Sequence, residues 1–228
     1  MQKEEEHIMT EIEAIRARHA VRNYTAKPLS PEIIDELSEE IEQCNRQGQL
    51  HIQLVTENED AFKTFIPLFG RFKNVKNYIA LAAKKQGDFY VKCGYCGARL
   101  MVKAQQAGLN SCWVTNTYNA KKCPVTLAPD EELVGVIAIG YGTTDGTQHK
   151  SKSMERLCKP CSDKWFLDGM NAAVLAPTGL NRQDFFIEAN GNTVSIRTKD
   201  NHPMSQINTG IVKYHFEIGA GRENFNWE

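Results

Sequence analysis

The sequence predicts an α+β fold in which a mostly antiparallel sheet is flanked by helices. Three observations support this prediction. Several segments carry apolar residues at helical spacing, and between them lie short apolar or alternating segments of strand length. The pair Asn190-Gly191 separates two strand-like segments and is typical of a tight hairpin turn.

Two helices are expected in the first 50 residues. Isoleucines recur at helical spacing in residues 7–17. A second helix should begin after Ser30, a preferred N-cap residue, with Pro31 at its first position and an acidic residue in its first turn. Gly48 is expected to end this helix. Its apolar face is formed by Ile33, Leu37 and Ile41.

Strands and one central helix are expected next. Residues 50–54 alternate in polarity, and residues 78–83 and 133–139 form apolar runs typical of buried strands. Between these runs, residues 92–107 should form a helix closed by Gly108 in the left-handed conformation. Small residues along this helix would allow a second helix to approach closely, which places it at the centre of the fold: Gly94, Gly97, Ala98, Ala104 and Ala107.

A polar stretch after Gly140 divides the chain into two regions, residues 1–156 and 157–228. The second region is expected to contain a helix at residues 165–173, a loop at 176–181 and strands at 184–189 and 193–197. A last helix carries one apolar stripe, formed by Ile207, Ile211, Tyr214 and Ile218.

Composition narrows the functional classes. The 228 residues carry a net charge of −1, which gives no indication of binding to nucleic acid or to a membrane surface. No apolar run has the length of a membrane span, and the acidic N-terminus does not resemble a secretory signal, so we expect a cytoplasmic protein. Seven cysteines, an odd number, predict reduced thiols rather than a disulfide framework.

Three separate segments carry groups suited to binding an anionic ligand. Arg16, Arg18, His19 and Arg22 place four potential cations in seven residues, which could hold a phosphate, although a solvated basic turn at a helix end is also consistent. The segment 150–152, Lys-Ser-Lys, could bind a phosphate or be an ordinary polar linker.

The third segment is the Ala-Pro-Thr-Gly-Leu-Asn loop at residues 176–181, followed by Gln183. Proline and glycine favour a tight loop, and the Thr, Asn and Gln side chains offer neutral hydrogen-bonding groups. Such a loop could press against a flat heteroaromatic ring and contact its edge. A simple helix-to-strand turn would explain the same residues.

Together these segments resemble the FMN-binding elements of the nitroreductase family. Residues 18–24, Arg-His-Ala-Val-Arg-Asn-Tyr, are similar to the family's Arg-(Arg/His)-Ser-x-(Arg/Lys)-x-(Phe/Tyr) motif. Residues 150–152 resemble its Lys-Ser-Arg phosphate motif, and residues 176–185 its Ala-Pro-Ser-x-x-Asn-x-Gln-Pro-Trp loop. The end of the central helix, at residues 104–109, is similar to the family's Ala-x-x-x-Gly-Leu.

The resemblance implies a cofactor, an activity and a role for each site residue. Arg18, Lys150 and Lys152 would hold the FMN phosphate, His19 would contact the ribityl chain or phosphate, and Arg22 would lie near the N1/O2 edge of the flavin. A looser match puts Arg71 at the pyrimidine end of the ring. Partners implied are NAD(P)H, as hydride donor, and a nitroaromatic or quinone-type acceptor. The residues expected to cover the ring or its edge are Pro177, Thr178, Gly179 and Asn181.

Two departures from the family pattern matter. Ala20 replaces a serine, which removes one hydrogen bond to the cofactor. The Pro-containing loop follows the second helix in the family and reaches into the partner subunit's site, whereas here it lies in the C-terminal region. The sequence therefore predicts that residues 157–228 are an abbreviated second protomer fused in cis, so that the chain is a monomeric pseudo-dimer.

Alternatives remain at this point. A non-catalytic FMN-binding protein would use the same segments. A metal-binding protein could be built on two C-x-x-C pairs, Cys93/Cys96 and Cys158/Cys161, although 62 residues separate Cys96 from Cys158 (158 − 96). No residue is expected to act as a catalyst, and His215 is expected to be a core or boundary histidine.

Overall fold

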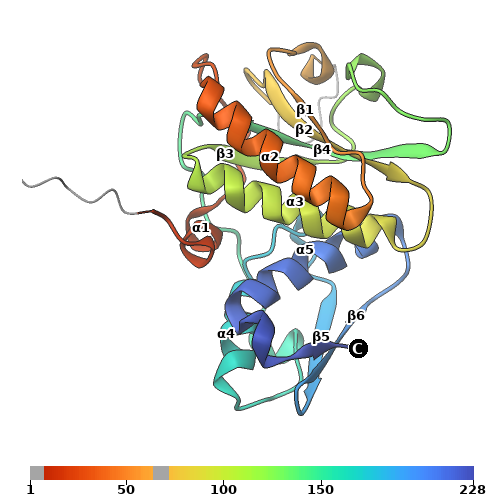
Figure 1. Ribbon diagram of the computed structural model, residues 1–228. Coiled ribbons are helices and arrows are strands. Elements are labelled where there is room, and N and C mark those ends of the chain that lie inside the picture. The colour runs from red at the N-terminus through yellow and green to blue at the C-terminus, as the bar shows by residue number, and fades with distance from the viewer. Residues whose placement is uncertain (1–7, 64–71) are drawn as a thin grey trace, which may run out of the picture.

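Two sheets and a set of α-helices form the computed structural model, which describes residues 8–63 and 72–228 (Figure 1). The α+β class predicted from the sequence is confirmed. The helices are α1 (Glu11–Ala17), α2 (Pro31–Gly48), α3 (Phe89–Gln106), α4 (Lys164–Ala173) and α5 (Pro203–Ala220). The strands are β1 (Gln53–Val55), β2 (Asn77–Lys84), β3 (Asn110–Val114), β4 (Glu131–Gly140), β5 (Phe185–Asn190), β6 (Thr193–Thr198) and β7 (Asn226–Trp227).

The larger sheet has the strand order β1-β2-β4-β3, and every pairing in it is antiparallel. Strands β2 and β4 form its centre and are almost entirely buried, as their apolar runs predict. Strand β3, which follows Gly108 and pairs with β4, has no counterpart among the strands expected from the sequence. The expected strand at residues 50–54 is shifted: β1 spans 53–55, and Leu50 makes only an isolated bridge to Ala83.

Helix α3 is the central helix of the molecule. It lies between α2 and α5 and packs on the larger sheet (Figure 1). Its small residues allow the predicted close approach: a Cβ added at Gly94 would lie 2.1 Å from the carbonyl oxygen of Ile207 on α5. On α5, a Cβ at Gly210 would lie 1.9 Å from the carbonyl oxygen of Val91. The backbones of α3 and α5 are therefore in direct contact at these two glycines.

The helix ends follow the capping residues with two exceptions. Ser30 caps α2 by accepting a hydrogen bond from the backbone N–H of Ile33, and Gly108 adopts a φ of +76° after α3, both as predicted. Helix α1 begins at Glu11 rather than residue 7, because Thr10 and Glu13 form a capping box there. Gly48 is the last residue of α2, as predicted, and the next residue, Gln49, takes the left-handed conformation.

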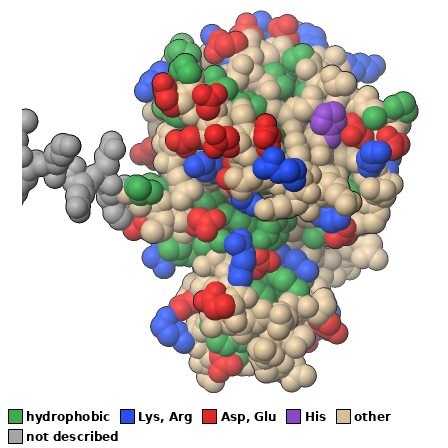
Figure 2. Space-filling model, in the orientation of Figure 1, with side chains coloured by type: hydrophobic (Ala, Val, Ile, Leu, Met, Phe, Trp, Pro, Cys, Tyr) green, Lys and Arg blue, Asp and Glu red, His purple; other side chains and the backbone are tan. Residues whose placement is uncertain are grey.

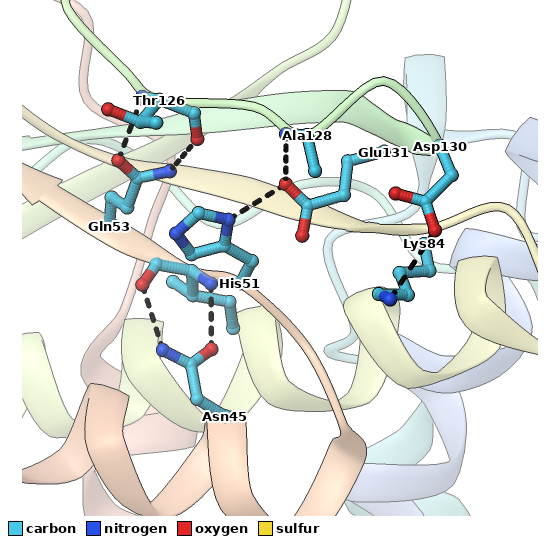
Figure 3. A network of polar contacts seen from close by, with 9 residues as sticks. Asn45, His51, Gln53, Lys84, Thr126, Ala128, Asp130 and Glu131 are labelled. Atoms are coloured by element: carbon cyan, nitrogen blue, oxygen red, sulfur yellow. Dashed lines mark hydrogen bonds and ion pairs between the residues drawn. The ribbon is translucent and has the colours of Figure 1, made fainter.

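Hydrogen bonds connect the end of α2 with the residues at the start of β1, and connect these in turn with the segment that leads into β4 (Figure 3). Asn45 on α2 accepts a hydrogen bond from the backbone N–H of Ile52 and donates one to its carbonyl oxygen. His51 contacts the Glu131 carboxylate through Nδ1 at 2.9 Å, and Gln53 exchanges two hydrogen bonds with the backbone of Thr126. These bonds hold an edge strand that is only three residues long.

The smaller sheet has the order β5-β6-β7, with β5 and β6 antiparallel across the predicted Asn190-Gly191 turn. Strand β7, at the C-terminus, pairs parallel to β6 and was not expected. One hydrophobic cluster joins α1 and α3 to α4, α5 and this sheet, so the regions 1–156 and 157–228 share a core. Among the described residues, no helix combines the length and apolarity that crossing a bilayer demands.

Candidate functional site

Arg18 is a buried cation whose Nε and Nη1 have no hydrogen-bond partner among residues 8–63 and 72–228. It caps the C-terminus of α1, where its backbone N–H donates to the carbonyl oxygen of Ala14. Its side chain is 4% exposed, and neither Nε nor Nη1 has a partner. Burial lowers the pKa of Arg18 to about 10, so the guanidinium remains charged at neutral pH. A buried charge of this kind is costly unless another group compensates it.

Backbone contacts fix the segment that follows Arg18. Ala20 bridges Ser111 on β3, and the backbone N–H of Val21 donates to the Ser111 carbonyl oxygen at 3.1 Å. The loop after β4 covers this segment, since a Cβ at Gly146 would lie 3.0 Å from Cβ of His19 and 3.3 Å from the carbonyl oxygen of Ala20. Residues 18–21 are therefore held between β3 and the loop that leads to residues 150–152. Arg22, beyond them, is exposed, and His19 is half-buried.

His215 is a second buried titratable residue, and it lies near Arg18 and His149. It is 1% exposed on α5, as expected of a core histidine, and its Nδ1 bonds the carbonyl oxygen of Ile211 at 2.9 Å. Its Nε2 is buried and has no partner. Burial, with the charges of Arg18 and His149 nearby, lowers the pKa of His215 to about 3, so its ring is neutral. A neutral ring with Nδ1–H donating leaves Nε2 as an acceptor.

The structure brings residues 150–152 against the 176–183 loop. Asn181 and Gln183 both donate side-chain hydrogen bonds to the Lys150 carbonyl oxygen, each at 2.9 Å. Gln183 also accepts from the backbone N–H of Lys152 at 2.8 Å. Two of the three segments predicted to bind the ligand are thus joined by hydrogen bonds, and Gln183, which is 2% exposed, is the residue that joins them.

The 176–183 loop has an unusual backbone. Leu180, Asn181 and Gln183 all have positive φ, between 47° and 53°. Non-glycine residues rarely adopt this conformation, and groups of them occur where the surrounding structure enforces it, often at functional sites. Thr178 helps to hold the loop in this conformation, because its Oγ1 accepts a hydrogen bond from the backbone N–H of Gln183 at 3.1 Å.

Helix α5 supports the same loop from the other side. Asn208 accepts a hydrogen bond from the backbone N–H of Gly179 at 2.9 Å. A Cβ at Gly179 would lie 2.5 Å from Sδ of Met204, so only glycine fits against the helix without displacing that side chain. Pro177 and Gly179 are half-buried and Thr178 is buried, whereas Asn181 is exposed and Leu180, at 79% exposure, projects from the loop.

The two lysines differ in their surroundings. Lys152 is half-buried and its Nζ contacts the Asp184 carboxylate and the Gln183 carbonyl oxygen, each at 3.1 Å. Its charge is therefore already balanced. Lys150 is exposed and forms no ion pair with any residue in the ranges 8–63 and 72–228. Arg71, the remaining expected cation, lies outside the described residues.

Sequence reasoning missed three contributors to this region. Asp184 and Asn208 are ordinary polar residues in the sequence, and their contacts with Lys152 and Gly179 depend on tertiary packing. Ser111, whose buried hydroxyl has no partner, sits on the strand that was not predicted. Among the residues that support the loop, Gln183 could be predicted from the sequence, because it matches the glutamine of the family's loop motif.

The four cysteines of the C-x-x-C pairs do not form a metal site in the described part of the chain. Cys93 and Cys96 lie on α3, while Cys158 is next to β5. Within residues 8–63 and 72–228, no group of three or more His, Cys, Asp or Glu side chains could hold a metal ion.

Comparison with known proteins identifies the family. Residues 11–220 match the model of the family described as "Putative TM nitroreductase". The chain belongs to this nitroreductase family. A solved structure of a "putative nitroreductase" from Thermotoga maritima is similar over 98% of this chain and 90% of that one, with 20% sequence identity and a TM-score of 0.69. The family predicted from the sequence is thereby confirmed.

Two shorter structures are similar to part of the chain. A "putative nitroreductase in complex with FMN" from Desulfovibrio desulfuricans matches 67% of this chain and 98% of its own, with 17% identity and a TM-score of 0.56. A "putative NADH dehydrogenase/NAD(P)H nitroreductase" from Parabacteroides distasonis matches 64% of this chain and 95% of its own, with 19% identity and a TM-score of 0.53. No curated protein matches the chain.

Proposed function

We propose that this chain binds one FMN and acts as an NAD(P)H-dependent oxidoreductase. The observation that carries the proposal is Arg18, a buried guanidinium with two nitrogen atoms that have no partner among the described residues, in the first of the three predicted segments. A buried cation favours an anion that reaches it, and a phosphate accepts charge-assisted hydrogen bonds from arginine. The FMN-bound relative from Desulfovibrio desulfuricans supports the choice of ligand.

The residues of the site fit this group. Arg18 would bind the phosphate together with Lys150, which is exposed and unpaired among the described residues. Lys152 would also bind it, with its Nζ contacting both the phosphate and the Asp184 carboxylate. Arg22 would lie near the N1/O2 edge of the ring, and His19 beside the ribityl chain or phosphate. The rigid loop would cover the ring or its edge through Pro177, Thr178, Gly179 and Asn181.

FMN, when bound, supplies the hydride chemistry: it takes a hydride from NAD(P)H and passes electrons to an acceptor of the nitroaromatic or quinone type. The protein contributes position and charge. The hydrogen bonds of Gln183 and Asn208 keep the loop in one conformation, which limits the entropy lost on binding. The relative named as an NAD(P)H nitroreductase supports the choice of hydride donor.

A non-catalytic FMN-binding protein is the second candidate, because two features weaken the site. Ala20 has no hydroxyl to donate to the cofactor, and Asp184 neutralises Lys152. The two candidates differ in one measurement, the oxidation of NAD(P)H by the FMN-loaded protein with a quinone or nitroaromatic acceptor. Turnover that depends on both substrates supports the enzyme, and tight FMN binding without turnover supports the second candidate.

The binding site is tested by titrating the flavin-free protein with FMN and following the absorbance change. We expect saturation at about one FMN per chain. The double variant Lys150→Ala/Lys152→Ala should bind FMN at least about tenfold more weakly, because two charge-assisted contacts are lost. Arg197→Ala, on β6, is the matched control, because Arg197 is paired with Glu188 and belongs to none of the three predicted segments, so this variant should bind FMN normally. Equal affinity in the double variant would place the phosphate elsewhere.

A substitution of Asp184 should strengthen FMN binding, the opposite of the effect expected for the lysine variants. Asp184→Asn removes the charge that neutralises Lys152, so FMN affinity should rise by about threefold to tenfold. Glu188→Gln is the matched control, because Glu188 is paired with Arg197 on the smaller sheet. Weaker FMN binding by Asp184→Asn would mean that the carboxylate positions Lys152 rather than competing for it.

A further inference from the structure

A pair of thiols joins α2 and α3 on the side of the protein away from the proposed site. Cys44 on α2 is fully buried and Cys96 on α3 is 6% exposed. The Cys96 thiol donates a hydrogen bond to the carbonyl oxygen of Cys44, with Sγ 3.9 Å from that oxygen, and the two side chains are close enough to influence each other's pKa. They belong to one hydrophobic cluster that also contains Leu37, Ile41 and Leu100.

The pairing joins cysteines that the C-x-x-C spacing does not. The C-x-x-C spacing pairs Cys96 with Cys93, three residues earlier on the same helix. In the structure Cys93 belongs to a different hydrophobic cluster, on the side of α3 that faces α5. The sulfur in contact with Cys96 comes from 52 residues earlier in the chain (96 − 44).

The surroundings make one thiol the better nucleophile. The neighbouring Cys44 side chain lowers the pKa of Cys96, whereas the Cys96 side chain and burial raise the pKa of Cys44. The Arg99 guanidinium, one turn along α3, lowers the pKa of Cys96 further. Arg99 is itself held by Glu40, Gln43 and Gln47 of α2. Acidic and basic side chains alternate over the face of the protein that α2 and α3 form (Figure 2).

We propose that Cys44 and Cys96 are a site of reversible oxidation, at which a peroxide converts the two thiols into a disulfide that links α2 to α3. The Cys96 thiolate attacks one peroxide oxygen, the O–O bond breaks, and Cys96 becomes a sulfenic acid as hydroxide leaves. The Cys44 thiol then attacks the Cys96 sulfur, an S–S bond forms, and the sulfenic oxygen leaves as water. Two sulfurs lose one electron each, and the peroxide gains both.

This site is independent of FMN binding, because none of its residues belongs to the proposed flavin site. Reduction by a dithiol reverses the reaction, since thiol–disulfide exchange returns both electrons. The experiment therefore distinguishes the two proposals: failure of FMN to bind would leave the thiol pair unaffected, and failure of the thiols to oxidise would leave the flavin site unaffected.

The test is oxidation of the full-length protein with hydrogen peroxide, followed by alkylation of the remaining thiols and peptide mass spectrometry. We expect a cross-link between the peptide that contains Cys44 and the peptide with Cys96, removed by dithiothreitol. Trypsin leaves Cys93 and Cys96 on one peptide, so the experiment is repeated in Cys93→Ala, which should retain the cross-link. In Cys44→Ala the cross-link should disappear, and a dimedone adduct should mark the sulfenic acid on Cys96.

A second variant avoids changes in the core. Arg99→Gln should slow formation of the cross-link by roughly twofold to fivefold, because the nearby positive charge is lost. Lys103→Gln, one turn further on α3, is the matched control and should react at the normal rate. The half-exposed Cys123 and Cys161 report that peroxide has reached the protein. If these two oxidise while Cys44 and Cys96 remain reduced, or if Cys96 links to Cys93 instead, the proposal is wrong.

Discussion

At the scale of single residues, the proposed role of Arg18 in binding FMN has a consequence for stability. The charge of this residue is buried, and its Nε and Nη1 have no hydrogen-bond partner among the described residues. In the protein without FMN, the free-energy cost of burying this charge is therefore not offset by ligand binding. Arg18→Met has a similar length and no charge. We expect it to raise the free energy of unfolding of the flavin-free protein by about 1–3 kcal/mol, measured by urea denaturation.

The same variant should bind FMN about tenfold to a hundredfold more weakly, because a charge-assisted hydrogen bond contributes about 1.5–3 kcal/mol. Arg16→Met is the control, since Arg16 is exposed on the same helix and should change neither quantity. A loss of stability in Arg18→Met would show that Arg18 has internal partners, which would remove the main support for the proposed phosphate contact.

His215 predicts a dependence of stability on pH. Burial lowers its pKa to about 3, below the value of about 6.5 for an unfolded histidine. Between these values the unfolded state binds the additional proton, so stability is retained above pH 6.5 and falls as the pH decreases toward 3. A single group of this kind accounts for about 2 kcal/mol between pH 6.5 and pH 5.

The measurement is urea denaturation at pH 7 and pH 5, in the parent protein and in His215→Gln. The variant should lose about 2 kcal/mol less between the two pH values, whatever its absolute stability. His202→Asn is the control, because His202 is exposed and asparagine preserves an N-cap acceptor for α5. An identical pH dependence in His215→Gln would show that the ring is protonated in the folded state.

At the scale of elements, the contact between α3 and α5 depends on glycine. A Cβ at Gly210 would lie 1.9 Å from the Val91 carbonyl oxygen and 2.6 Å from the Tyr95 nitrogen, and backbone atoms cannot move as a flexible side chain can. We expect Gly210→Ala to lower the free energy of unfolding by about 3 kcal/mol or more, measured by urea denaturation. Ala107→Ser, at the half-buried residue that follows α3, should stay within about 0.5 kcal/mol of the parent.

Elements that have strong local signals could be predicted from the sequence, and elements that depend on a partner could not. Strands β2 and β4 are apolar along their length, and α3 has both a helical pattern and a glycine cap. Strand β3 mixes Asn110, Ser111 and Trp113 with apolar residues, so only its pairing with β4 makes it a strand. Strand β7 is two residues long and depends in the same way on β6.

The same distinction between local signals and tertiary contacts applies to the candidate site. The motifs locate the segments that meet, since residues 150–152 and the 176–183 loop do join. The protonation and partners of individual side chains follow from tertiary packing. For that reason the sequence indicated neither the burial of Arg18, nor the neutralisation of Lys152 by Asp184, nor the contact between Cys44 and Cys96.

At the scale of the whole molecule, we propose that the second region supplies in cis what the resemblance assigns to a partner subunit. The 176–183 loop bonds residues 150–152 of its own chain, and α5 packs along α3 through glycine contacts on both helices. The shorter FMN-bound relative matches only 67% of this chain while 98% of its own is covered. The remaining third of the chain is consistent with an added, abbreviated protomer.

This arrangement predicts a monomer with one FMN per chain. Sedimentation equilibrium across a hundredfold range of protein concentration should give the mass of one chain, and the ratio of FMN to chain should remain about one throughout. A concentration-independent dimer whose FMN is lost when it is forced apart would contradict the fused arrangement, because the sites would then be shared between chains. Two FMN per monomer would also contradict it, since the second region would then contain a phosphate site of its own. Gly179→Ala adds a direct check: its Cβ would press on Met204 and displace the loop, so FMN binding should weaken in the monomer without any change in mass.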